Sequence, residues 1–150
     1  MIYSQIMVAI DGRETSNLAL REAVRLAKDQ DAMLRIIYVV DESIANYIEG
    51  YVDFDALWDA YKEEGNQILN RIDKEVKKEK VNFETRLIEL KPAEGCIAEK
   101  IAAEARNWPA DVLVMGTHGR RGLSHFFLGS IAEQVIHLST VPVLLLRSES

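Results

Sequence analysis

Five apolar residues in a row, Ile6-Met7-Val8-Ala9-Ile10, stand near the start of the chain, and Asp11-Gly12 follows them directly. This run does not alternate with polar residues, which is typical of a strand covered on both faces in a parallel sheet. Comparable apolar runs predict four further strands. They cover 34–40, 83–90, 112–115 and 141–146. Apolar and polar residues alternate somewhat more in 83–90 than in the other segments.

Segments whose apolar residues recur at helical spacing lie between these strands. Thr15 or Ser16 is expected to cap the first of them, and Pro92 to open the third, which ends at 107–109. The last covers about 130–138. This order predicts an α/β fold: one doubly wound, open sheet of five mainly parallel strands with helices on both faces. We expect a single domain over residues 1–150.

The second helix, expected from about residue 54 to 80, follows a stretch rich in acidic and aromatic residues. Phe54, Trp58 and Tyr61 recur at helical spacing in its first part. We interpret them as the residues that pack this helix on the sheet. The alternative is a mobile lid over the ligand site.

Composition argues against several classes of partner. The formal net charge of −6 argues against nucleic acid, because neutralising phosphates requires clustered Lys and Arg. No segment reaches the roughly 18 uninterrupted apolar residues that span a membrane, and no secretory signal is recognisable. Cys96 is the single cysteine, so an intrachain disulfide cannot form. We expect a cytoplasmic protein without membrane or nucleic-acid partners.

The segment from Gly116 to Ser130 is the strongest indication of a binding site. Ligands of open α/β sheets bind beyond the carboxyl ends of the strands, and this segment follows the fourth expected strand. Gly116 and Gly119 leave the main chain open to a phosphate. Gly129-Ser130 stands where the next helix begins, and a helix N-terminus attracts anions. The sequence therefore predicts a phosphate site here.

The spacing Gly-2x-Gly-9x-Gly-Ser over 116–130 resembles the ATP-binding signature of universal stress proteins. The likeness extends over essentially the whole chain, including Ile6 to Gly12, Tyr38 to Asp41 and the last two strands. Arg13 departs from it, because a serine is commoner there. The resemblance implies a Rossmann-like fold of the adenine nucleotide alpha hydrolase-like type, with ATP as the ligand. The sequence leaves open whether Mg²⁺ accompanies the nucleotide.

By this resemblance, Asp11 contacts the ribose and the main chain near Val39 contacts the adenine. The residues expected to hold the phosphates are Gly116, Gly119, Gly129, Ser130 and the amides of Ile131 and Ala132. Ala9, Met115 and Arg120 complete the expected ATP-binding set. A plain turn or helix cap is the simpler interpretation of Asp11 taken alone, and Arg120 and Arg121 taken alone are ordinary surface residues.

The resemblance further implies a nucleotide-dependent regulatory or stress-survival module that forms a homodimer. The apolar strand Val141 to Leu146 is well placed to pair with its copy. No carboxylate or lysine is arranged to position a water against a γ-phosphate, so we expect at most weak ATPase activity. The alternatives are a dimeric scaffold of the same fold that works without nucleotide and, with less support, a flavodoxin-like FMN domain.

Four further residues invite a chemical interpretation. His118, His125 and His137 lack the ligand spacing of a metal site. Cys96 is expected to be a small core residue on an apolar helix face. The downstream protein partner is not identified by any of these residues.

Overall fold

The five apolar runs form one sheet in the computed structural model, which describes residues 2–11, 14–42, 53–117 and 129–147, those of 14–16 without their side chains. The strands are β1 (Gln5–Ile10), β2 (Met33–Asp41), β3 (Asn82–Leu90), β4 (Val112–Gly116) and β5 (Val143–Leu146). Their order in the sheet is β3-β2-β1-β4-β5, and every neighbouring pair is parallel. The predicted fold class is confirmed.

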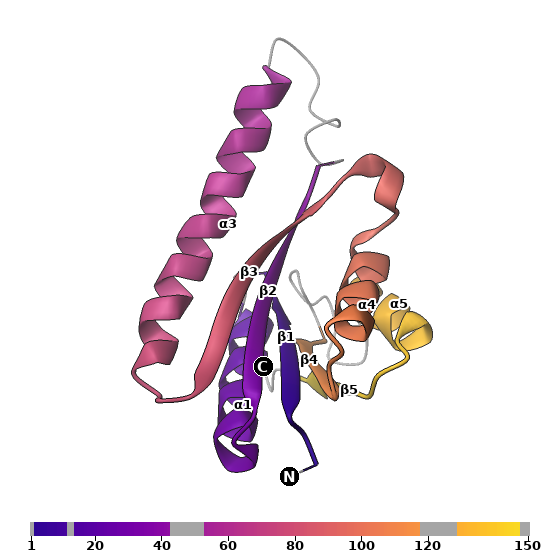
Figure 1. The fold of residues 1–150 in the computed structure, drawn as a ribbon. Coiled ribbons are helices and arrows are strands. Elements are labelled where there is room, and N and C mark those ends of the chain that lie inside the picture. The colour runs from indigo at the N-terminus through magenta and orange to yellow at the C-terminus, as the bar shows by residue number, and fades with distance from the viewer. Residues whose placement is uncertain (1, 12–13, 43–52, 118–128, 148–150) are drawn as a thin grey trace.

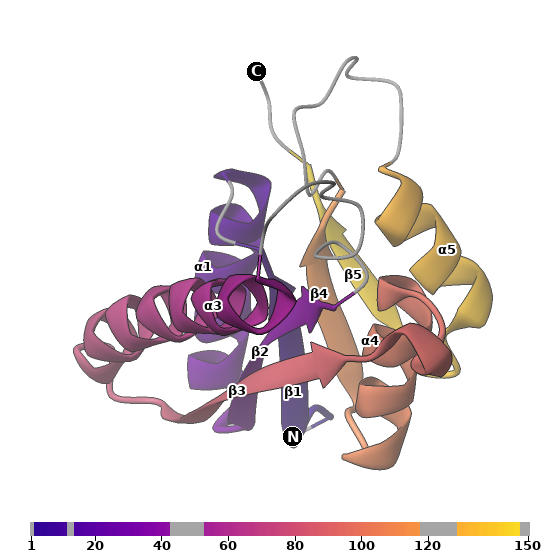
Figure 2. The same ribbon diagram turned by 90° about the horizontal axis from the view of Figure 1, so that it is seen from above.

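Helices cover both faces of the sheet (Figures 1 and 2). They are α1 (Glu14–Gln30), α3 (Phe54–Lys77), α4 (Ile97–Asn107) and α5 (Ser130–Leu138), with a short 3₁₀ turn, η1 (Pro92–Glu94), before α4. In both views α1 and α3 lie on one side of the strands, and α4 and α5 lie on the other. None of the helices in the described ranges is long and apolar enough to cross a bilayer.

Alternating side chains of β1 divide the core into two layers, because successive residues of a strand point to opposite faces. Ile6, Val8 and Ile10 belong to the cluster that includes α1 and α3. Met7 and Ala9 belong to the cluster that includes α4 and α5. All five are buried, so β1 is covered on both faces, as its unbroken apolar run predicts.

Two expectations about helix starts are wrong. α1 begins at Glu14, so Thr15 and Ser16 lie inside its first turn and cannot be its cap. Pro92 opens η1 rather than α4, because Gly95 interrupts the chain with φ 99°, a conformation that no helix contains.

The buried residues of α3 lie further along the helix than predicted. They are Gly65, Leu69, Ile72 and Val76, whereas the aromatic residues near its start are only half-buried. The first turns of α3 extend beyond the end of the sheet, which explains this difference (Figure 1). Trp58 instead has the Lys62 ammonium 5.4 Å from the centroid of its ring.

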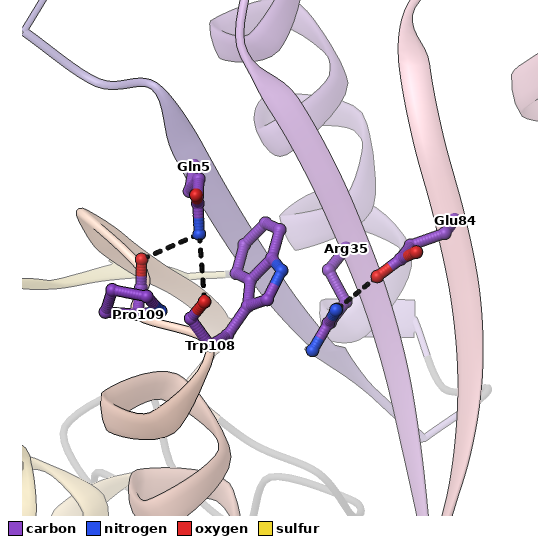
Figure 3. Close-up of polar contacts among 5 residues, drawn as sticks. All are labelled: Gln5, Arg35, Glu84, Trp108 and Pro109. Atoms are coloured by element: carbon purple, nitrogen blue, oxygen red, sulfur yellow. Dashed lines mark hydrogen bonds and ion pairs between the residues drawn. The ribbon is translucent and has the colours of Figure 1, made fainter.

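A polar cluster closes the amino-terminal edge of the sheet (Figure 3). The guanidinium of Arg35 on β2 pairs with Glu84 on β3 and lies 4.5 Å from the centroid of the Trp108 ring. The side-chain amide of Gln5 donates hydrogen bonds to the carbonyls of Trp108 and Pro109, at 3.3 and 2.9 Å. The cluster joins three strands to the end of α4, at the edge opposite the predicted site.

Candidate nucleotide site

β1 and β4 separate at their carboxyl ends. Their pairing stops at Val8 and Val114, although β1 continues to Ile10 and β4 to Gly116. On their outer sides, the same ends stay paired with β2 and β5. The chain order also reverses between β1 and β4, since β2 and β3 follow β1 on one side while β5 follows β4 on the other. This position is the switch point at which open α/β sheets bind ligands.

A pocket opens at this separation. The described residues leave about 560 Å³ of empty space here, part of it open solvent. Asp11 is the single charged residue among the residues that form the lining, and the others are apolar. The lining residues are Ala9, Ile10, Asp11, Val39, Ile97, Ile101, Met115, Gly116, Ile131 and Ala132.

The N-terminus of α5 forms one wall of this pocket. Gly129 is the N-cap residue, with extended backbone angles, and among the described residues no side chain caps the helix there. The first N–H groups of a helix have no partner within the helix, and the helix dipole makes this end positive. Ile131 and Ala132, in the first turn, line the pocket. The pocket therefore has an uncapped, positive helix end on this side.

Thr117 fixes the position of that helix end. Its carbonyl accepts a hydrogen bond of 2.6 Å from the N–H of Gly129, and its own N–H donates to the carbonyl of Leu146 at 2.9 Å. Thr117 is buried. One residue thus joins the end of β4, the end of β5 and the start of α5.

The start of α4, which lies on the same face of the sheet as α5, also lines the pocket and is capped by the chain itself. The carboxylate of Glu99 accepts a hydrogen bond of 3.3 Å from the N–H of Cys96. Just before it, the Glu94 carboxylate accepts one of 2.9 Å from the N–H of Lys91. That bond, reinforced by a hydrogen bond from Lys100, holds the pKa of Glu94 below its ordinary value. The first turn of α4 is therefore tied down and already has a negative group at its positive end.

Cys96 packs against the core, as expected, but not from the apolar face of a helix. It is the N-cap of α4 and is half-buried, with Sγ 3.3 Å from a carboxylate oxygen of Glu99. Its expected position on a helix face is wrong because Gly95 delays the start of the helix, which places Cys96 before the first turn.

The structure brings most of the predicted ATP-binding residues to this one pocket. Those in its lining are Ala9, Asp11, Val39, Met115, Gly116, Ile131 and Ala132. Gly129 and Ser130 open α5 beside Ile131. Gly119 and Arg120 lie outside the described residues, as do His118 and His125.

The sequence-based site omitted Ile10, Ile97 and Ile101, which also line the pocket. Ile97 and Ile101 belong to α4, whose apolar residues recur at helical spacing. An apolar helical face predicts burial without distinguishing a core contact from a pocket wall. The location of the start of α4 could have indicated these residues, because α4 starts at the same edge of the sheet as α5.

The described lining has one carboxylate and is otherwise apolar. In the part of the chain that the structure describes, no three His, Cys, Asp or Glu residues are grouped so that they could hold a metal ion. An apolar wall, one carboxylate and a positive helix end fit a ligand that has a flat apolar part at one end and anionic groups at the other.

Sequence comparison finds relatives over almost the whole chain. The family model described as the universal stress protein family matches residues 2–147. Universal stress protein MJ0531 of Methanocaldococcus jannaschii is 34% identical over 146 residues, covering 97% of this chain and 83% of that protein. Universal stress protein YxiE of Bacillus subtilis is 32% identical over 154 residues, covering 97% of this chain and all of that protein.

Solved structures have the same fold. A universal stress protein family member from Burkholderia pseudomallei has a TM-score of 0.79 and 33% identity, covering 98% of both chains. A universal stress protein in complex with cAMP has a TM-score of 0.71 and 23% identity, covering 99% of this chain and all of the other. One from Archaeoglobus fulgidus in complex with dAMP has a TM-score of 0.61 and 21% identity, covering 98% of this chain and all of the other.

Proposed function

Because this chain belongs to the universal stress protein family, we propose that it binds an adenine nucleotide, ATP, in the pocket between β1 and β4. The observation that carries the proposal is the convergence of Asp11, Val39 and Gly116 with the uncapped start of α5 on one open pocket. The neighbours in complex with cAMP and dAMP support the choice of an adenine nucleotide.

In this proposal, the phosphates lie at the α5 end of the pocket. The start of α4 already has the Glu99 carboxylate close by, which disfavours a second anion there. The start of α5 has no side-chain cap from the described residues, and a helix start of this kind can donate its first N–H groups to phosphate oxygens. The residues that would hold the phosphates are Gly116, Gly129 and Ser130, with the amides of Ile131 and Ala132, and Gly119 and Arg120 from the segment between them.

Titration calorimetry with ATP tests this proposal, with Ser130→Asp as the informative variant. Ser130 is exposed in the first turn of α5. A carboxylate there stabilises the helix but repels phosphate. We expect at least about tenfold weaker ATP binding, unchanged adenosine binding and no loss of thermal stability. Thr140→Asp, an exposed position after α5, is the control with the same charge change. Absence of binding by the unchanged protein at millimolar ATP would refute the proposal.

We further propose that the protein is a nucleotide-dependent regulatory or stress-survival module with at most slow ATP hydrolysis. The pocket lining supports this, because its described residues include no pair of groups that could activate and position a water. Turnover should be far below the roughly 1–1,000 s⁻¹ of ordinary enzymes. A faster steady-state rate that falls in Asp11→Ala while ATP binding remains would contradict this part. The single cysteine favours a reducing, cytoplasmic compartment.

The proposed partner is a second copy of the chain, paired through β5. The structure has this strand from Val143 to Leu146, two residues shorter at its start than predicted, and at the edge of the sheet. Leu144 is 39% exposed on it. An apolar edge strand with an exposed leucine is a surface that proteins usually cover.

A further inference from the structure

We infer that Ile97 and Ile101 of α4 contact the C2 edge of the adenine, an inference that rests on the proposed function. This contact makes the site reject purines that have a substituent at C2. The strand ends alone do not form the pocket. Both isoleucines line it, together with residues of β1, β2, β4 and α5.

The two isoleucines form a continuous apolar wall. They are four residues apart on α4, so they lie on the same face of the helix, one turn above the other. Ile101 is 4% exposed, and Ile97, the first residue of the helix, is half-buried. Ile97 therefore lies nearer the mouth of the pocket and Ile101 nearer its floor.

The position of this wall is fixed by the turn before it. Gly95 has φ 99°, and a Cβ at this residue would come within 3.0 Å of the Glu99 carboxylate. The hydrogen bond from Cys96 to Glu99 and the ion pair between Lys100 and Glu94, at 3.0 Å, hold the first turn of α4. A wall held in this way excludes an extra group on the ligand instead of yielding to it.

The polar edge of the base has a different partner. β2 runs beyond Tyr38, its last residue paired with β1, and ends at Asp41. The main chain of this overhang, which includes the pocket residue Val39, offers a donor and an acceptor. Adenine presents the matching pair at its C6 amino group and N1, and C2 is the next ring atom. C2 has only a hydrogen, so it can lie against isoleucine at no polar cost.

A 2-amino group would lose its hydrogen bonds to water against this wall. A polar group that is buried without a partner weakens binding. 2-Aminoadenosine triphosphate keeps the C6 amino group and N1 of ATP, so it tests this edge alone. We expect the unchanged protein to bind it about tenfold more weakly than ATP, or weaker still.

Ile97→Ser is the variant to measure, because serine leaves room and offers a hydroxyl to the added amino group. We expect the ratio of the two Kd values to fall to within about threefold. Ile136→Ser is the matched control, since Ile136 is 44% exposed on α5 and outside the pocket lining. An unchanged ratio in Ile97→Ser, or equal binding of both nucleotides by the unchanged protein, overturns the inference.

A second measurement does not depend on a stable variant. With ¹³C-labelled isoleucine methyl groups, the adenine H2 proton of bound ATP should show nuclear Overhauser effects to Ile97 and Ile101. If H8 shows them instead, the base is reversed and the inference is wrong while ATP binding stands. Failure of ATP to bind at all removes the proposed function itself, which separates the two failures.

Discussion

Arg35 shows how one side chain can hold elements together at the edge opposite the site. Its side chain is only 12% exposed, and its planar guanidinium pairs with Glu84 while stacking on Trp108. Lysine keeps the charge but cannot make the stacked and paired contacts together. We expect Arg35→Lys to lower the free energy of unfolding by about 1–2 kcal/mol. Urea unfolding measures this, and Arg25→Lys, at a position 77% exposed, should change it by less than about 0.5 kcal/mol.

For single residues, the sequence predicted the end of the sheet at which a residue lies better than it predicted whether the side chain faces the core or the pocket. Asp11, Val39 and Gly116 could be assigned to one end of the sheet because each closes or nearly closes a strand, and the structure places them around one pocket. Ile97 could not be assigned to that pocket. Its apolar side chain obeys the same helical period as the core residues Ala98 and Ile101, and only the packed structure shows which of them face empty space.

Helix α3 packs closely on the sheet at Gly65. A Cβ at this residue would lie 2.7 Å from Cδ1 of Leu87 and 3.1 Å from the ring of Tyr38. Gly65→Ala would raise the helix propensity and displace only flexible side-chain atoms. A branched side chain at this position would overpack the contact. We expect Gly65→Val to lower the free energy of unfolding by about 1–3 kcal/mol.

Asn66→Val is the control for Gly65→Val. Asn66 is exposed on the same helix, and asparagine and valine have similar helix propensities. If both variants unfold at the same urea concentration, the close approach of α3 at Gly65 has no energetic weight.

Element types were predictable, and element ends were less so. Apolar runs identified β1 and β4, whose side chains are nearly all buried, while the edge strand β3 was identified from a more alternating segment and is mostly half-buried or exposed. The last strand starts at Val143 rather than Val141, although the carbonyl of Pro142 already accepts a hydrogen bond from Leu113. The start of α4 was missed because Gly95 takes a backbone conformation that a periodicity pattern does not register.

On the scale of the whole molecule, the alternation of strands and helices predicted the doubly wound sheet and the edge that holds the site. It did not predict that β1 and β4 stop pairing at Val8 and Val114. Pairing between strands that are far apart in the sequence depends on how the helices on both faces pack, and this information is not local.

The proposed dimer makes a prediction at this scale. Leu144→Lys places a charge on the edge strand of both copies, so the two charges repel when the strands meet. We expect the dimer Kd to rise at least about tenfold, measured by sedimentation equilibrium. Ile2→Lys, at an apolar residue 85% exposed before β1, is the control. A monomeric unchanged protein at micromolar concentration would contradict the dimer.

The hydrogen bond between Thr117 and Gly129 also bears on how the chain could change over evolution. These residues are adjacent in space, although residues 118–128 separate them in the sequence. The entropy of closing a flexible loop grows only logarithmically, by about 0.6 kcal/mol for each doubling of its length. Insertions or exchanged peptides at this point should therefore leave the sheet intact. The fold can therefore accept a longer or different peptide between Thr117 and Gly129.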